Sequence, residues 1–281
     1  MGGDRYINAK TIGDDKMKIG IIGLGVVGTA IKNGFEKLGH GIICHDLKLN
    51  STVSDTVNTE IVFICVPTPQ GDDGSCDTSI ITAVIQELEQ LEYKGIIAIK
   101  STVECGFTQQ TIDTFTDLTI CFVPEFLRER CAEDDFVNNH NVLAVGTNDP
   151  FVYQKIVEAH GHYPKDKVRL KPTEAEILKY YNNVFAATKI NFANIMNELC
   201  EKTNCDYTKI KNAFVKGGRC KDTYLDVNDD LKGYGGMCLP KDVRAMDKLL
   251  DKLNIDFDMF KSIDADNSKL KITVFNGMRK E

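Results

Sequence analysis

The sequence lacks the features of a membrane-bound or exported chain. Among its 281 residues there is no apolar run of about 18, the length that a membrane-spanning helix needs, and the first 16 residues contain no apolar core of a secretory signal. It also has no low-complexity segment and no internal repeat. We therefore expect a cytoplasmic protein without a membrane partner, and the length predicts two domains of about 150 residues each.

An excess of positive charge is also absent. The 34 Lys and Arg residues are outnumbered by 41 Asp and Glu residues, which gives a formal net charge of −7. Proteins that bind nucleic acid need basic surfaces to meet its phosphate backbone. We therefore expect no nucleic-acid partner, and an anionic small ligand would need a local cluster of basic side chains.

Paired cysteine and histidine motifs are missing as well. Ten cysteines occur, but none form a C-x-x-C pair, and Cys44, Cys65 and Cys121 lie in apolar runs typical of buried strands. Such thiols are small inert hydrophobes, so the cysteines indicate a reducing compartment rather than a disulfide framework. We expect no metal, because no H-x-x-H pair occurs and His45, Cys44 and Cys238 lack the spacing of metal ligands.

What the sequence does contain is a regular alternation of short apolar runs and helical patterns from Met17 to about residue 170. Six of the runs have the composition of strands, and their alternation with helices predicts a parallel sheet with crossover helices. From about Pro172 some 30 residues contain no Gly or Pro, which predicts one long helix with Thr173 and Glu176 as a capping box. Shorter helical patterns follow at 208–217 and 241–253.

These patterns predict an α/β protein. We expect a flexible tail over 1–16, an N-terminal Rossmann-type domain with a parallel sheet over 17–170, and an all-helical central domain with one long helix over 171–281. The long helix carries apolar residues around its whole circumference, and one small domain cannot cover all of them. We therefore expect a homodimer formed through this helix. The apolar residues in question include Phe185, Ile190, Phe192 and Ile195.

A glycine-rich turn follows the first apolar run in "IGIIGLGVVGTAI", where three glycines have the G-x-G-x-x-G spacing. The first permits a tight turn, the second admits a pyrophosphate to the backbone, and the third lets the next helix pack on its strand. An aspartate 18 residues past the third glycine can bind a ribose 2′-hydroxyl and repel a 2′-phosphate, which favours NAD over NADP, although Lys48 is close by. The alternative is a structural turn beside a solvated aspartate. The expected cofactor contacts here are Gly23, Gly25, Val26, Val27, Gly28 and Asp46.

A second candidate site lies in "GYGGMCLPKD". Pro240 suits the first turn of a helix, so the helix dipole and Lys241 would both stabilise a thiolate at Cys238. Gly235 and Gly236 would leave room for a substrate beside the thiol. The alternative is a helix entry with a small packed cysteine.

Two further pairs of polar residues have a spacing of four. Lys179 and Asn183 in the long helix would share one face. Glu125 and Glu129 follow an apolar strand, where ligands of a parallel sheet bind, and in a helical turn both could face the cleft. For each pair, solvated surface side chains are the alternative.

At this point the sequence resembles the UDP-glucose/GDP-mannose dehydrogenase family. Six segments match in order and span Met17 to about Asn267: "GLGVVG", "CVPTP", "KSTV" followed by Gly106, "PEFLRE", "EAEILKYYNNVFAATKINFANIMNE" and "GYGGMCLPKD". The resemblance implies an oxidoreductase that converts the C6 alcohol of a nucleotide sugar to a carboxylate, most simply UDP-glucose to UDP-glucuronate. It also implies two NAD per turnover and no release of the aldehyde.

The resemblance implies roles for individual residues. Cys238 would take the aldehyde as a thiohemiacetal and become a thioester. Lys179 and Asn183 would stabilise oxyanions, Asp242 and Thr102 would hold a water for proton transfer, and Glu125 would assist thioester hydrolysis. The cofactor contacts implied beyond the glycine turn are Pro67, Thr68, Thr102, Glu129 and Lys241. The implied substrate contacts are Phe126, Leu127, Lys179, Asn183, Tyr224, Gly233, Gly235 and Arg219, whose guanidinium suits a diphosphate.

The sequence departs from the family pattern in several places. Met237 replaces a serine, Leu239 replaces a phenylalanine, and Glu104 stands in place of a proline. Members of the family continue into a second α/β domain that covers the nucleotide, whereas this sequence ends at Glu281, so we expect that UDP-binding domain to be lacking. Two alternatives stay open: a two-electron β-hydroxyacid dehydrogenase, which shares the helix pattern K-x-x-N-N but has no use for Cys238, and a non-catalytic protein that binds NAD or a nucleotide sugar.

Overall fold

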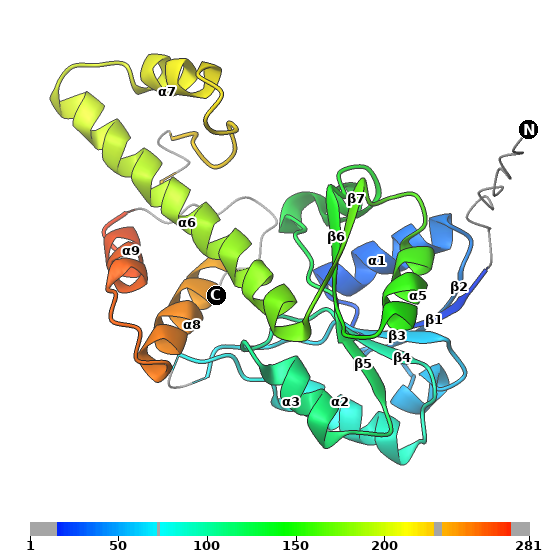
Figure 1. Cartoon of the computed structure of the whole chain (residues 1–281). Coiled ribbons are helices and arrows are strands. Elements are labelled where there is room, and N and C mark those ends of the chain that lie inside the picture. The colour runs from blue at the N-terminus through cyan, green and yellow to red at the C-terminus, as the bar shows by residue number, and fades with distance from the viewer. Residues whose placement is uncertain (1–15, 72–73, 228–231, 271–281) are drawn as a thin grey trace, which may run out of the picture.

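The computed structural model describes residues 16–71, 74–227 and 232–270 (Figure 1). Apart from Lys16, the predicted tail over 1–16 lies outside these ranges, as do residues 271–281 of the predicted helical domain. Within them, seven strands form a single sheet in the order β2-β1-β3-β4-β5-β6-β7. The strands are β1 (Lys18–Ile22), β2 (Gly41–His45), β3 (Ile61–Ile64), β4 (Ile96–Ile99), β5 (Thr119–Phe122), β6 (Val142–Gly146) and β7 (Asp166–Leu170).

The sheet is parallel in two parts that meet at one point. Strands β1 to β5 run parallel, β6 and β7 run parallel to each other, and β6 meets β5 antiparallel through the single pair Phe122 and Gly146. Both residues end their strands, so the carboxyl ends of the two parts face each other. The sequence prediction of a parallel sheet is therefore wrong at β6, and it missed β7, because "DKVRL" is partly exposed at the sheet edge and has no apolar run.

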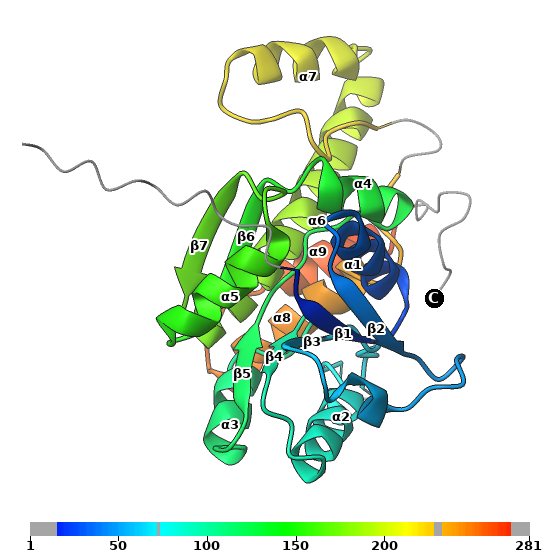
Figure 2. The ribbon, with the colours of Figure 1, turned by 90° about the vertical axis from the view of Figure 1, so that its right-hand side faces the viewer.

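Helices cover both faces of this sheet (Figure 2). One apolar core lies between the strands and α1, α4 and α5, and a second lies between the strands and α2 and α3. These helices, with two short 3₁₀ turns, are α1 (Val26–Lys37), η1 (Val53–Thr56), α2 (Ser79–Gln90), α3 (Phe107–Thr114), η2 (Glu129–Cys131), α4 (Ala132–Val137) and α5 (Pro150–His160).

The rest of the described chain is helical. Figure 1 shows the long helix α6 leaving the sheet with α8 and α9 beside it and α7 at its far end. A third core joins Val184 of α6 to Val243 of α8 and Ile263 of α9. The α/β fold class, a Rossmann-type sheet followed by helices that include one long helix, is as the sequence predicted. The helices are α6 (Pro172–Lys202), α7 (Tyr207–Lys216), α8 (Leu239–Lys252) and α9 (Met259–Asn267).

Helix α6 begins differently from the sequence prediction. Its N-cap is Lys171, whose backbone N–H donates to Glu174 Oε2 (2.7 Å), and Pro172 occupies the first turn. The predicted pair of Thr173 and Glu176 is therefore not the cap. The first turns also pack closely on β6, because a Cβ placed on Gly146 would lie 2.8 Å from Ala175 Cβ.

The outer side of α6 is apolar and open to solvent. The exposed fraction is 53% for Phe185, 57% for Phe192 and 54% for Ile195, whereas Ile190 packs on the core with α8 and α9. Within the described residues, three of the four apolar residues named from the sequence are thus more than half exposed. In the described ranges no helix is both long and apolar enough to cross a membrane.

Candidate active site

The glycine turn lies between β1 and α1. Gly23 has a φ of 93°, in the left-handed region that favours glycine, and Gly25 is the N-cap of α1. A Cβ on Gly28 would lie 1.9 Å from the Gly23 carbonyl oxygen, so the helix can lie this close to the turn only without a side chain there. Val26 and Val27 form the first turn of the helix. The arrangement leaves backbone N–H groups at a helix N-terminus open to an anion, which fits a dinucleotide pyrophosphate.

Asp46 holds its carboxylate beside this turn. It follows β2 directly, and its Oδ2 accepts from Leu24 N (2.7 Å) while its Oδ1 accepts from Lys48 N (2.9 Å). These two backbone donors lower the pKa of Asp46, so its negative charge is fixed next to the glycines. Such a carboxylate can accept from a ribose hydroxyl and repels a phosphate. The geometry therefore fits the NAD that the sequence predicts.

Two loops continue this surface past β3 and β4. Pro67 and Thr68 follow β3, and Thr102 follows β4, the next strand of the sheet. Cys76 connects the loops, because its Sγ donates to the Thr102 carbonyl oxygen (3.3 Å) and hydrogen-bonds the Thr68 side chain. The three residues named from the sequence in these loops are thus brought together.

Glu125 and Glu129 do not share a helical turn, so that prediction is wrong. Residues 125–128 are irregular, and Glu129 begins the 3₁₀ turn η2. Glu125 points to α6, whereas Glu129 is only partly buried.

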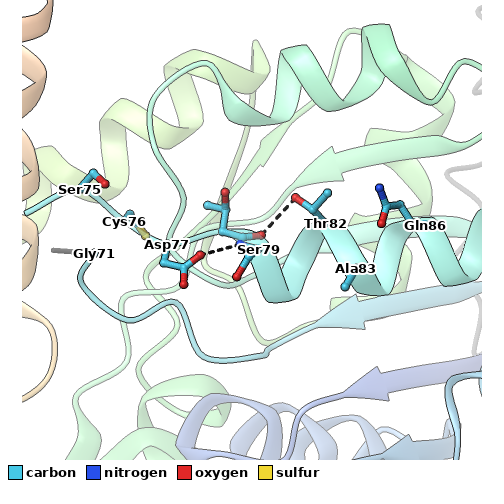
Figure 3. Close-up of a pocket in the computed structure, with 9 residues that line it drawn as sticks. Gly71, Ser75, Cys76, Asp77, Ser79, Thr82, Ala83 and Gln86 are labelled. Carbon is cyan, nitrogen blue, oxygen red and sulfur yellow. Dashed lines mark hydrogen bonds between the residues drawn. The ribbon is translucent and has the colours of Figure 1, made fainter. Parts of the chain in front are cut away.

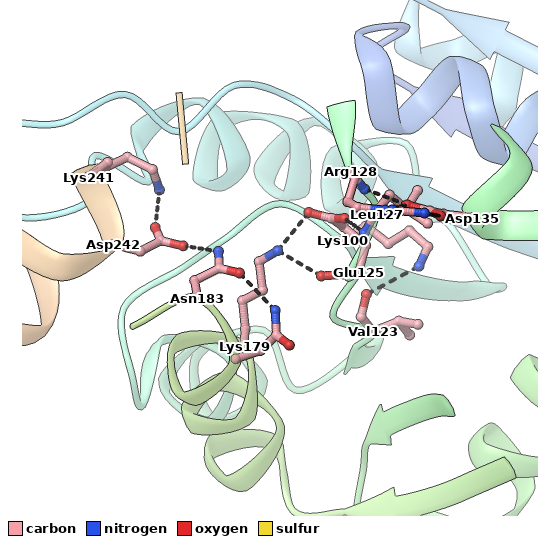
Figure 4. A network of polar contacts seen from close by, with 11 residues as sticks. Lys100, Val123, Glu125, Leu127, Arg128, Asp135, Lys179, Asn183, Lys241 and Asp242 are labelled. Carbon is pink, nitrogen blue, oxygen red and sulfur yellow. Dashed lines mark hydrogen bonds and ion pairs between the residues drawn. The ribbon is translucent and has the colours of Figure 1, made fainter. Parts of the chain in front are cut away.

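A buried ion pair joins the sheet to α6. Lys179 Nζ donates to Glu125 Oε1 (2.7 Å) and to the Glu125 carbonyl oxygen (2.7 Å), and the side chains are only 4% and 10% exposed (Figure 4). Leu127 N donates to Glu125 Oε2 (2.6 Å). Burial acts to raise the pKa of Glu125, but the Lys179 ammonium and these donors outweigh it and lower the pKa. Burial acts to lower the pKa of Lys179, and Glu125 outweighs it, so both groups are charged.

A second set of polar contacts joins α6 to α8. One turn after Lys179, Asn183 Nδ2 donates to Asp242 Oδ2 (2.6 Å), and Asp242 Oδ1 pairs with Lys241 Nζ (3.0 Å). Asp242 is completely buried, and Lys241 Nζ lies 4.0 Å from the Sγ of Cys76, which connects the loops after β3 and β4. The spacing of Lys179 and Asn183 thus places both on one face, as the sequence predicts.

Cys238 is the N-cap of α8, and its side chain is exposed. Its carbonyl oxygen accepts from Asp242 N (2.9 Å), which fixes the helix start beside the thiol. The protein around its inner side raises the pKa of Cys238; Lys179 and Lys241 act in the opposite direction, and Glu125 adds to the rise. The helix start and Lys241 were expected to stabilise a thiolate, but the protein packed around the sulfur has the larger effect and the pKa is raised, so the resting form is the thiol.

The residues predicted to bind substrate occupy two places. Gly233 and Gly235 flank the buried Tyr234, whose N–H and carbonyl oxygen bond the Asn267 side chain (2.8 and 2.9 Å), and so they lie in the anchored loop before Cys238. Arg219 has an exposed position just after α7, which lies at the far end of α6, rather than a place beside Cys238.

Tyr224 and Phe126, two of the remaining substrate candidates, lie near lysines of α6. Tyr224 returns to α6, where Lys189 Nζ lies 5.2 Å from its ring centroid. The Phe126 ring lies near the ion pair of Lys179 and Glu125, with Lys179 Nζ 5.9 Å from the ring centroid, and Leu127 follows Phe126 in the chain. Phe126 and Leu127 are therefore close to Lys179.

Sequence reasoning missed two charged residues that support this site. Lys100, at the end of β4, is buried and donates to the Val123 carbonyl oxygen (3.4 Å), and burial lowers its pKa. Arg128 makes a two-pronged ion pair with the buried Asp135 (2.9 and 2.6 Å), which holds the loop that carries Glu125. Lys100 begins the "KSTV" segment and Arg128 lies in "PEFLRE", so position within a motif was the available signal.

A hollow of about 580 Å³ lies beside the loop after β3 and the start of α2 (Figure 3). Cys76, Asp77 and Ser79 are among its lining residues, but Cys238 and Lys179 are not. Within the described residues, no group of three or more His, Cys, Asp or Glu side chains could hold a metal ion.

Two models of one protein family match the chain. The UDP-glucose/GDP-mannose dehydrogenase family, NAD binding domain, matches residues 45–162, and the central domain of the same family matches residues 173–269. The first match begins after the glycine turn, so the assignment of that turn depends on the geometry described above.

Individual relatives agree with these matches. A UDP-glucose 6-dehydrogenase from Pseudomonas aeruginosa is 31% identical over 240 residues, which cover 80% of this chain and 52% of that protein. The chain spans 64% to 66% of three further curated relatives. The solved UDP-glucose dehydrogenase from Pyrobaculum islandicum superposes with a TM-score of 0.84 at 25% identity, over 92% of this chain and 69% of that one. A UDP-D-ManNAc dehydrogenase from Pyrococcus horikoshii shares the fold, with a TM-score of 0.76 at 19% identity over 90% and 68% of the two chains.

Proposed function

Because the chain belongs to the UDP-glucose/GDP-mannose dehydrogenase family, we propose that it oxidises the C6 alcohol of a nucleotide sugar to a carboxylate with NAD. UDP-glucose is the substrate that the names of its curated relatives favour. The observation that carries the proposal is the exposed thiol of Cys238 beside two buried polar pairs, Lys179 with Glu125 and Asn183 with Asp242. We further propose 17–170 and 171–281 as two domains, since the two family matches fall on either side of residue 171.

The glycine turn and Asp46 would hold NAD, which would accept two hydrides, so that one alcohol, one water and two NAD would give one carboxylate, two NADH and three protons. The thiol of Cys238 would carry the aldehyde between the two oxidations. Its sulfur forms a bond to the aldehyde carbon, and the thiol proton passes to the aldehyde oxygen, which gives a thiohemiacetal. Because its pKa is raised, the thiol enters this step protonated.

The buried pairs would act on the charges that develop at this carbon. The Lys179 ammonium and the Asn183 amide would donate to the oxyanion, and Asp242 with Thr102 would hold the water that moves protons. After the second oxidation a thioester remains. Water then breaks the carbon–sulfur bond and restores the thiol, and Glu125 would assist by accepting a proton from that water.

The test is product stoichiometry with a panel of nucleotide sugars. Wild-type protein should give two NADH per sugar acid. Cys238→Ala should keep NAD affinity, because the glycine turn lies on a different element, but lose acid formation. Cys238→Ser should accumulate a slowly hydrolysed ester that intact-mass measurement detects. Cys205→Ala is the matched control, because Cys205 is an exposed thiol in the turn after α6.

One NADH per turnover with free aldehyde, or acid formed by Cys238→Ala at the wild-type rate, would contradict the proposal. The first outcome would favour the β-hydroxyacid type of two-electron oxidation. NAD affinity without turnover of any nucleotide sugar would favour a binding protein.

A further inference from the structure

Glu176 of α6 faces the interior rather than solvent. Its side chain is completely buried, and its two oxygens accept from backbone N–H groups, Oε2 from Gly106 (2.5 Å) and Oε1 from Thr108 (2.7 Å). Gly106 is the N-cap of α3, and Thr108 is its second residue. One carboxylate of α6 therefore caps a helix of the sheet region.

The capped segment carries a predicted catalytic residue. Residues 100–106 run from the end of β4 to the start of α3 and contain Thr102. Gly106 has a φ of 96°, so this segment turns in a conformation that a residue with a side chain rarely adopts. Glu176 lies three residues before Lys179, on the same side of α6. The cap thus links the segment that contains Thr102 to the turn of α6 that precedes Lys179.

The start of α3 and the Glu176 carboxylate depend on each other for hydrogen bonds. The N–H groups at a helix start have no partner within the helix, and a buried carboxylate is costly without donors, so each side needs the other. Burial raises the pKa of Glu176, and the two N–H donors oppose the rise. Ala175, next to Glu176, packs closely on Gly146 of β6 and adds a second contact between α6 and the sheet.

We propose that Glu176 is a positioning residue for the oxidation, and that its cap on α3 sets the separation between Thr102 and the Lys179–Asn183 face of α6. This inference rests on the proposed function. Without the cap, α6 shifts relative to the loop, and Lys179 moves away from Cys238 and from the oxyanion that forms there. A misplacement of about 1 Å can lower a rate about a hundredfold.

The experiment compares Glu176→Gln with Glu174→Gln. Glutamine at 176 keeps one acceptor but turns an NH₂ group toward the second N–H. Glu174 is the matched control, because it also accepts a backbone N–H in the first turn of α6, from Lys171, but in an exposed contact. We expect Glu176→Gln to lower kcat about tenfold or more, with the KM for NAD changed less than about twofold, and Glu174→Gln to leave both unchanged.

A second measurement does not require turnover. The rate of Cys238 alkylation by iodoacetamide, followed by peptide mass spectrometry between about pH 7 and 10.5, reports the thiol pKa. Because Lys179 lowers that pKa, we expect the Glu176→Gln profile to move to higher pH by about 0.3 units or more, and the Glu174→Gln profile to match the wild type.

Each outcome decides the proposal. A Glu176→Gln protein that melts at a lower temperature but keeps the wild-type kcat and alkylation profile would overturn it, because the cap would then be structural only. If wild-type protein makes no sugar acid, the proposed function fails, and the alkylation profile alone decides the position of Lys179. If Glu176→Gln does not fold, Glu176→Asp, which keeps the charge but can reach only one donor, is measured in the same way.

Discussion

Replacing Gly28 with alanine tests the glycine turn most directly. The added Cβ would lie 1.9 Å from the Gly23 carbonyl oxygen and 3.0 Å from its carbon, which are backbone atoms that cannot rotate away. Ordinary contact at about 3.4 Å requires α1 to move by about 1.5 Å, yet Ile31 and Phe35 hold this helix in the core. Overpacking of this kind costs about 1–3 kcal/mol, and we expect the upper end, about 3 kcal/mol. At about 2–4 °C per kcal/mol, the melting temperature should fall by about 6–12 °C.

The same movement should weaken NAD binding. It displaces the helix N-terminus from the pyrophosphate, and the loss of one hydrogen bond to a charged group, about 1.5–3 kcal/mol, raises Kd about tenfold or more. Calorimetric titration of NAD and thermal unfolding measure the two effects. Gly41→Ala is the control: the nearest atom to its Cβ is 3.9 Å away, so this variant should be as stable as wild type or up to about 1 kcal/mol more stable. A Gly28→Ala protein that melts within 1 °C of wild type and binds NAD equally well would refute the reasoning.

Three further predictions follow from other parts of the structure. Asp46→Asn should narrow the preference for NAD over NADP, because it removes the charge that repels a 2′-phosphate. Equal kcat/KM of the wild type with both cofactors would show that Asp46 does not discriminate between NAD and NADP. Burial acts to raise the pKa of Asp135, but Arg128 outweighs it and the pKa is lowered. This ion pair therefore stabilises the fold above about pH 4, and the stabilisation is lost as the pH falls through the lowered folded-state pKa. Urea unfolding should show Asp135→Asn less stable than wild type at pH 7, and the difference in unfolding free energy should shrink below about pH 4. Phe185→Glu with Phe192→Glu on the exposed side of α6 should convert the proposed homodimer to a monomer in sedimentation experiments, and a wild-type monomer at micromolar concentration would contradict the dimer.

The parts of the fold that depend on local pattern could be predicted from sequence. Strands β1 to β6 lie in short apolar runs, and the pattern over the 31 residues of α6 is too long for a strand, so only a helix fits it. The antiparallel contact at β6 could not be predicted, because the pair of Phe122 and Gly146 depends on how two distant segments meet. The cap of α6 was misassigned for a related reason: Thr173 and Glu176 have the right spacing, but the burial of Glu176 against α3 is a tertiary contact.

The candidate site shows the same division. Spacing alone places Lys179 and Asn183 on one face, and Pro240 marks the start of the helix after Cys238. The protonation of Cys238 depends on burial and on charges from three separate segments, at 125, 179 and 241–242, whose net effect no local pattern gives. Arg219 was assigned from a motif, and only the three-dimensional structure shows that α7, which it follows, lies at the far end of α6.

The connection from β7 to α6 determines how the two parts of the molecule can move. Only Lys171 separates Leu170, the last residue of the strand, from Pro172, the first of the helix, and proline fixes its own φ. A hinge needs a few residues with free torsions, and this junction offers only Lys171. Ala175 against Gly146 and Glu176 against α3 add two tertiary contacts within the next turn. Closure around a ligand must therefore occur as a small shear of packed elements, and larger opening motions are confined to segments farther along the chain.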